Sequence, residues 1–203
     1  MLGVSKLKNT KVALDLDDVI VPSAAAIIDT YNQQFGTALT LAQLYSTGLD
    51  EWGVPDEETA VQRVDAIVGA DEFYRLAPTQ QAIAGVRTLH KQAQQLYIIT
   101  GRPDIVSVAT CRWLEEHFPD IFTDVIFSNL YDKEKFLDKG DLCVDLGVGV
   151  LIDDHLRHVT SASGKGIECV LFGNYPWNQA DTLPAGVTRC LDWPAVLEYF
   201  DEP

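Results

Sequence analysis

Short apolar segments alternate with amphipathic segments along most of this chain, and that alternation constrains the fold more than any other feature. Continuous apolar strands separated by helices are typical of a parallel sheet that helices bury on both faces. The sequence therefore predicts an α/β fold of this kind. The predicted strands are 11–16, 96–100, 124–128, 148–152 and 168–172, and the helices between and after them are 79–93, 104–118, 141–146, 156–163 and 192–200.

One stretch interrupts this rhythm with helices alone. We expect residues 22–77 to form a small helical cap inserted after the first strand, while residues 1–21 and 78–203 form the α/β core domain. The alternative is a long helical connection packed on the sheet. Helices are predicted at 23–35, with Ser23 as the N-cap, at 40–48 and at 56–68, with a further turn or two at 71–76.

The charge of the chain limits its partners. Its formal net charge is −15 and its sequence pI is about 4.4. Nucleic acids and anionic membranes bind through positive charge on a protein, so we expect no nucleic acid polymer and no membrane as a partner. An anionic phosphoester would also be repelled, so a phosphate enzyme this acidic needs a cation in its site.

The sequence is that expected of a cytoplasmic protein with reduced thiols. No segment approaches the roughly 20 apolar residues of a membrane-spanning helix. Residues 1–11 contain no apolar stretch of signal-peptide length. The cysteines form no Cys-x-x-Cys pair and give no zinc signature. They are Cys111, Cys143, Cys169 and Cys190.

Polar side chains follow three of the predicted strands. The carboxyl ends of parallel strands meet at one edge of a sheet, where ligands bind. Five carboxylates gathered there need a counter-charge, and oxygen ligands favour Mg²⁺, with Asp15 and Asp153 as its carboxylates. The strand ends read Asp15-Leu16-Asp17-Asp18, Thr100-Gly101-Arg102 and Asp153-Asp154.

These residue types suit phosphoryl transfer. Asp15 and Asp17 are two residues apart and would point the same way in an extended chain. Asp15 can attack phosphorus to form an aspartyl-phosphate, and Asp17 can act as acid and base, with a pKa raised by its acidic neighbours. Thr100 offers a hydroxyl to the phosphoryl group, and Gly101 lets the backbone N–H approach it.

A positive side chain is expected to face the phosphoryl group. Lys139, just before a predicted helix, is the first choice, and Lys133 and Lys135 are the competing lysines. Arg102 can contact substrate phosphate or simply begin a helix.

Taken in order, Asp15-x-Asp17, Thr100-Gly101, Lys139 and Asp153-Asp154 resemble the haloacid dehalogenase superfamily over residues 11–200. The resemblance implies a Rossmann-like sheet with a movable cap. It implies Asp15 as nucleophile, Asp17 as acid and base, and Thr100 and Lys139 as phosphate binders. Mg²⁺ would be held by Asp15, the Asp17 backbone carbonyl and Asp153, with Asp154 in support. Asp17 favours phosphatases and phosphotransferases over the dehalogenases themselves.

The last third has a narrower resemblance, to the 5′(3′)-deoxyribonucleotidase-like group, whose members carry a helical cap in the same place. His155 departs from that group, where a serine often follows the acidic pair. The matching segments are 139–143, 151–154, 166–167 and 171–178.

Several residues have simpler interpretations. His155 and His158 more often face solvent than bind a second metal. Asp18 and Asp154 can orient neighbours or cap helices. The aromatic residues Trp52, Phe73 and Tyr74 are expected in the core of the cap rather than stacked on a base. Tyr175 and Trp177 are expected in a surface loop, with a position at the border of the site left open.

The predicted function is a Mg²⁺-dependent phosphatase for small phosphomonoesters, with 5′-(deoxy)nucleotides as candidate substrates. Its partner would be a small phosphorylated metabolite or a nucleotide, and a homodimer is left open. The alternatives are a phosphomutase or other phosphotransferase on the same core, and a non-catalytic phosphate-binding module.

Overall fold

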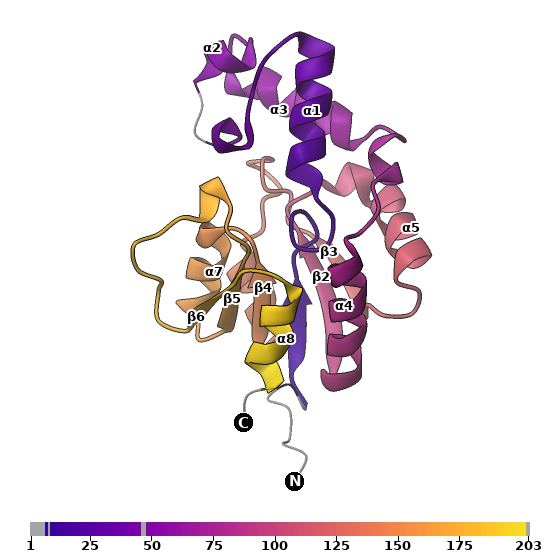
Figure 1. Ribbon diagram of the computed structural model, residues 1–203, viewed down its shortest axis with the longest axis vertical. Coiled ribbons are helices and arrows are strands. Elements are labelled where there is room, and N and C mark those ends of the chain that lie inside the picture. Colours follow the sequence, from indigo (N-terminus) through magenta and orange to yellow (C-terminus); the bar gives the residue numbers. More distant parts are fainter. Residues whose placement is uncertain (1–6, 8, 46–47, 202–203) are drawn as a thin grey trace.

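The computed structural model describes residues 7, 9–45 and 48–201, and within them six parallel strands form one sheet (Figure 1). The order across the sheet is β3-β2-β1-β4-β5-β6. The predicted α/β fold is confirmed. The strands are β1 (Lys11–Leu14), β2 (Gln95–Thr100), β3 (Asp124–Phe127), β4 (Val150–Asp153), β5 (Glu168–Phe172) and β6 (Val187–Cys190).

Helices cover both faces of this sheet. The α-helices are α1 (Ser23–Phe35), α2 (Leu49–Trp52), α3 (Glu57–Val68), α4 (Gln80–Gln92), α5 (Ser107–His117), α6 (Lys139–Leu146), α7 (Leu156–Ser163) and α8 (Trp193–Asp201). Short 3-10 turns occur at η1 (Leu41–Gln43), η2 (Phe73–Arg75), η3 (Asp104–Val106) and η4 (Pro176–Asn178).

Alternation along each strand divides the core into two layers. Val12 and Leu14 face one side, where they join a cluster with residues of α4, α5 and α8. Ala13 faces the other side and packs with residues of α6 and α7. Both faces are therefore buried, which explains why the strands are continuously apolar.

The strand order brings two distant acids together. The chain runs from β1 outward through β2 to β3, and then returns to place β4 on the other side of β1. Ligands bind at such a reversal, beyond the carboxyl ends of the strands. The backbone N–H of Asp15 donates to the carbonyl of Ile152 at 2.8 Å, so Asp15, the first residue after β1, lies beside Asp153, the last residue of β4.

Helices α1, α2 and α3 lie over the carboxyl edge of the sheet (Figure 1). They share an apolar cluster of their own, which includes Tyr31, Trp52, Ile67 and Phe73. Trp52 and Phe73 are thus core residues of this helical layer, as predicted. That residues 22–77 act as a separate, movable cap stays a prediction.

Three sequence predictions need correction. Strand β6 was missed, because Thr188 and Arg189 leave it without an apolar run. The helix predicted at 40–48 is instead the single turn η1, with α2 beginning at Leu49, and residues 46–47 lie outside the described residues. Ser23 does not cap α1; Pro22 occupies the N-cap position, without a side-chain hydrogen bond.

All four cysteines are free thiols, as predicted, and three of them are buried. In the part of the chain that the structure describes, no helix is long and apolar enough to cross a membrane.

Candidate active site

A buried lysine joins the two acids at the reversal of the sheet. The Lys139 ammonium lies 3.0 Å from Oδ1 of Asp15 and 2.7 Å from Oδ2 of Asp153. Lys139 is only 1% exposed, and Asp153 is fully buried. Lys139 begins α6, after Asp138 caps that helix by accepting the N–H of Asp141. The structure therefore places Lys139 at Asp15, whereas Lys133 and Lys135 are exposed.

The two carboxylates that share Lys139 have pKa values displaced in opposite directions, although the lysine lowers both. Burial raises the pKa of Asp15, and the lowering effect of Lys139 does not fully offset it. Burial also disfavours the charged form of Asp153, but Lys139 and His158 outweigh it and hold its pKa below the ordinary value. The pKa of Lys139 is raised, because its two acidic partners overcome its desolvation.

His158 belongs to this cluster, so the prediction that it faces solvent was wrong. Its Nδ1 lies 3.1 Å from Oδ1 of Asp153, and the residue is 5% exposed. The reason is that His158 lies next to Val159 on the face of α7 that packs on the sheet. Its Nε2 has no hydrogen-bond partner among the described residues. His155 is half-buried and caps the same helix by accepting the N–H of Arg157.

Asp17 has a different counter-charge. The Arg102 guanidinium donates to Asp17 from Nε at 3.0 Å and from a terminal nitrogen at 2.6 Å, and its other terminal nitrogen donates to Thr110. Ser23 also donates a short hydrogen bond to Asp17. Burial raises the pKa of Asp17, but Arg102 and these hydrogen bonds outweigh it and lower the pKa. The expectation of a raised pKa was therefore wrong, because it left out Arg102.

Asp18, which precedes the N-cap position, provides the side-chain acceptor for the first turn of α1. Its carboxylate accepts the N–H of Ala24, at 3.1 Å and 3.2 Å to its two oxygens. The loop from Asp15 can reach this point because it turns sharply, with Asp18 at a φ of 59°. Burial, together with the charge of Asp17, raises the pKa of Asp18 to about 8.

Asp154 is held by the loop after β5. Trp177 donates its indole N–H to Asp154 at 2.7 Å, and Tyr175 donates its hydroxyl to the backbone carbonyl of Asp18 at 2.7 Å. The two rings stack with centroids 4.6 Å apart. Burial and the neighbouring acids raise the pKa of Asp154 well above its ordinary value. These aromatic residues therefore border the site, which is the position that the sequence left open.

Thr100 and Gly101 end β2 beside this loop. Thr100 is fully buried, and its hydroxyl accepts the N–H of Arg102 at 3.2 Å. Gly101 lies against Leu130, where an added Cβ would meet that side chain at 3.4 Å. The roles of Thr100, Gly101 and Arg102 as phosphate binders stay predictions.

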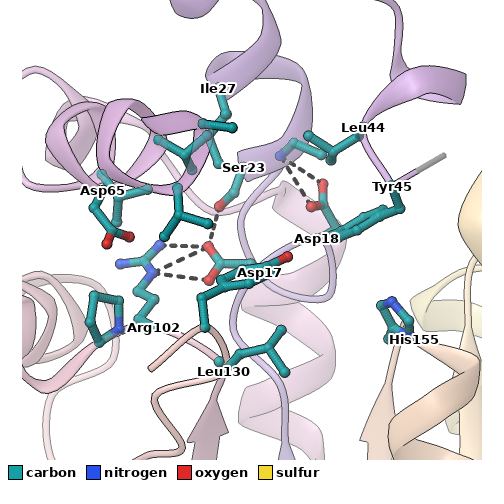
Figure 2. Close-up of a pocket in the computed structure, with 18 of the residues that line it drawn as sticks. Asp17, Asp18, Ser23, Ile27, Leu44, Tyr45, Asp65, Arg102, Leu130 and His155 are labelled. Atoms are coloured by element: carbon teal, nitrogen blue, oxygen red, sulfur yellow. Dashed lines mark hydrogen bonds and ion pairs between the residues drawn. The ribbon is translucent and has the colours of Figure 1, made fainter. Parts of the chain in front are cut away.

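A cavity of about 330 Å³ separates the acidic floor from the helical layer. Asp15, Asp17, Asp18 and Asp154 line its floor, and Figure 2 shows Asp17 and Asp18 directed toward separate partners there. Strand β1 ends at Leu14, so Asp15 and Asp17 lie beyond the strand on which their common direction was predicted. Both nevertheless line this cavity.

Sequence reasoning missed the upper wall. Tyr45 lies with its ring centroid 5.3 Å from those of His155 and Trp177, so it spans from the helical layer to the core. Asp65 and Tyr131 also line the cavity. Nothing in the sequence around Tyr45 or Tyr131 signals this position, whereas the spacing of residues along α3 could have indicated Asp65.

Comparison with known proteins assigns the family. The model of the family described as 5′ nucleotidase, deoxy (pyrimidine), cytosolic type C protein matches residues 9–197. The chain belongs to this family. Its predicted place in the haloacid dehalogenase superfamily, in the nucleotidase-like group, is confirmed, and it is a hydrolase of the phosphatase and nucleotidase type.

Individual relatives agree with this family. A Bacillus cereus protein named "Putative nucleotidase" is 27% identical over 181 residues, which cover 86% of this chain and 91% of the relative. A haloacid dehalogenase-like hydrolase from Streptococcus pneumoniae has a similar fold, with a TM-score of 0.69, 18% identity and coverage of 95% and 98%. CbbY from Rhodobacter sphaeroides, solved in complex with phosphate, matches with a TM-score of 0.62, 14% identity and coverage of 96% and 100%.

Replacing Lys139 tests the buried cluster. We expect Lys139→Met to lower the free energy of unfolding by about 3–5 kcal/mol, because it leaves two buried carboxylates without their shared cation. Urea unfolding of the metal-free protein would measure this. Lys135→Met is the control: Lys135 pairs with Asp104 on the surface, where screening makes an ion pair weak, so its loss should change stability far less. Equal losses in the two variants would contradict the central role of Lys139.

Asp18 should make the stability depend on pH. The folded protein keeps this proton up to about pH 8, whereas the unfolded chain releases it near 3.8, so the free energy of unfolding falls as pH rises between these values. Asn accepts the same N–H and tolerates positive φ. We therefore expect Asp18→Asn to gain stability over the wild type as pH rises through this range.

Urea unfolding without divalent cations, at several pH values between about 4 and 8, would measure the difference. The exposed variant Asp29→Asn should instead stay parallel to the wild type. A constant difference between Asp18→Asn and the wild type would contradict the assignment.

Proposed function

We propose that this protein is a Mg²⁺-dependent phosphatase that hydrolyses small phosphomonoesters, 5′-(deoxy)nucleotides among them, through an aspartyl-phosphate on Asp15. The observation that carries the proposal is the position of Asp15. It lies on the floor of a cavity large enough for a small ester, bound to the buried Lys139 and lining the same space as Asp17. Membership of a nucleotidase family supports the substrate class.

The residues around Asp15 fit a hard divalent cation. Asp15 and Asp153 each offer a carboxylate oxygen, and His158 offers a nitrogen, within 4.8 Å of one another. Mg²⁺ prefers the oxygens. The pKa values of Asp15 and Asp154 are raised by burial and by neighbouring acids, as expected where several carboxyls share too little positive charge. We therefore assign Mg²⁺ to Asp15, Asp153 and the Asp17 backbone carbonyl, with Asp154 in support.

When bound, Mg²⁺ would offset the charge of the phosphoryl oxygens. In the first step, a carboxylate oxygen of Asp15 attacks phosphorus while the ester oxygen leaves. Lys139 offsets negative charge beside the attacking carboxylate, and Thr100 and the N–H groups of its loop orient the phosphoryl oxygens. In the second step, water attacks phosphorus and releases Asp15 with inorganic phosphate.

Asp17 moves protons in both steps. Its pair with Arg102 favours the ionised carboxylate, which is the form that accepts a proton from the attacking water. The first step needs the protonated form if the leaving group is a poor one. Esters with an acidic leaving group should therefore depend on Asp17 only in the second step.

The first test is phosphate release from a panel of phosphomonoesters that includes nucleotides. We expect release to require Mg²⁺, to stop on chelation, and to fall at least about a thousandfold in Asp15→Asn, which removes the nucleophile. Asp29→Asn, a matched change on the exposed side of α1, should retain activity. Full activity of Asp15→Asn would overturn the proposal, and transfer of phosphate to an added sugar phosphate without release would favour a phosphotransferase.

Asp17→Asn should separate the two steps. With 4-nitrophenyl phosphate, whose leaving group needs no proton, kcat/KM should change little while kcat falls, with a burst of nitrophenol. With an alkyl phosphate, kcat/KM should fall by about a hundredfold or more, because the leaving oxygen loses its proton donor. Equal losses of kcat/KM with both esters would contradict the assigned role of Asp17.

A further inference from the structure

One face of α3 forms a wall of the cavity. Its lining residues are Glu57, Ala60, Val61, Val64, Asp65 and Val68. Their spacing of three and four residues places them on a single helical stripe. Such a stripe, turned toward the interior, is normally apolar. Two of its six positions are acidic, so the charges within it need an explanation.

Local structure does not explain Asp65. It is half-buried, and burial is the only cause of its raised pKa, so no hydrogen bond or ion pair among the described residues supports its carboxylate. It also lies in the last turn of α3, where the helix dipole disfavours a negative charge. Glu57 lies in the first turn, where the dipole favours it, yet it lines the same cavity.

The two carboxylates act on one region of the cavity. The pKa of Tyr131, on the facing loop after β3, is raised first by burial; Arg157 lowers it, and the charges of Asp65 and Glu57 raise it. Figure 2 shows Asp65 on the α3 side of the cavity, above Arg102 and Leu130. The acidic groups therefore lie on the side opposite the floor that holds Asp15.

Among the described residues that line the cavity, no free cation offsets them; Arg157, which acts on Tyr131, is not one of these residues. Arg102 is the only lysine or arginine among the described residues that line the cavity, and Asp17 and Thr110 already take its hydrogen bonds. The wall of the cavity formed by α3 is thus negatively charged. At the opposite end, Lys139 and Mg²⁺ would offset the charge of the phosphoryl group.

We infer that this cavity selects phosphomonoesters whose leaving group carries no second negative charge, with Asp65 and Glu57 as the specificity-determining residues. The inference rests on the proposed phosphatase function. Like charges a few ångströms apart in a partly buried space repel strongly, whereas a neutral or cationic leaving group meets apolar side chains and two acceptors.

A matched series of aryl phosphates tests this. The 4-carboxyphenyl, 4-carbamoylphenyl and 4-(aminomethyl)phenyl esters are nearly equal in size and differ in charge. At about pH 8, we expect the wild-type kcat/KM for the carboxylate to be at least about tenfold below that for the amide. Asp65→Asn should reduce this ratio to about threefold or less, and Asp65→Asn with Glu57→Gln should remove it.

Glu58→Gln is the control. It removes the same charge from the same helix turn as Glu57. Both glutamates are exposed, but Glu58 accepts a hydrogen bond from Gln62 and does not line the cavity. It should keep the wild-type ratio. Comparing ratios between variants cancels the differences in leaving-group acidity between the three esters.

Binding of the corresponding aryl phosphonates in Mg²⁺, measured by calorimetry, makes the same comparison without turnover. Weaker binding of the carboxylate, relieved in Asp65→Asn, supports the inference even if no ester is hydrolysed, in which case the phosphatase proposal alone fails. Equal affinities and equal kcat/KM values across the charge series, or a Glu58→Gln effect as large as that of Asp65→Asn, would overturn the inference.

Discussion

The shared ion pair of Lys139 with Asp15 and Asp153 is the interaction on which the rest of the site depends. A lysine this buried is stable only with its partners in place. It is held there because α6 packs very closely on α7. A Cβ on Gly140 would meet the Ser161 hydroxyl at 2.7 Å and the Ala162 nitrogen at 2.9 Å, so only glycine allows this approach. The contact between two helices thus fixes the charge beside Asp15, the proposed nucleophile.

Different counter-charges give two neighbouring aspartates different properties. Burial raises the pKa of Asp15, and Lys139, whose charge is shared with Asp153, does not fully offset it. Arg102 directs two nitrogens at Asp17 alone, and the pKa of Asp17 is lowered. Environments that push the pKa values of adjacent acids apart are how one site assigns them separate tasks. Arg102 also lies 5.1 Å from the ring centroid of Phe73, so the charge that governs Asp17 touches the helical layer.

The sequence predicted those features of the fold and the site that depend on local residue patterns and on where the strands end. Buried strands are apolar throughout, and parallel strands end at one edge, so the fold and the proximity of Asp15 and Asp153 could be predicted. Strand order, which puts β1 beside β4, depends on long-range packing and could not. The role of Arg102 was missed for the same reason, since its partner Asp17 is 85 residues away in the chain. His158 was misjudged because solvent exposure was assigned without knowing which face of α7 meets the sheet.

Asp18 connects three parts of the site. Its side chain holds the first turn of α1, its carbonyl receives the Tyr175 hydroxyl, and it follows Asp15 by three residues. One short loop therefore sets both the position of Asp15, the proposed nucleophile, and the direction in which α1 leaves the sheet. The side of the cavity opposite these acids is lined by a separate stretch of chain, from α1 to α3. Substitutions in that stretch can change the selectivity for substrates while the residues proposed to act on the phosphoryl group stay the same.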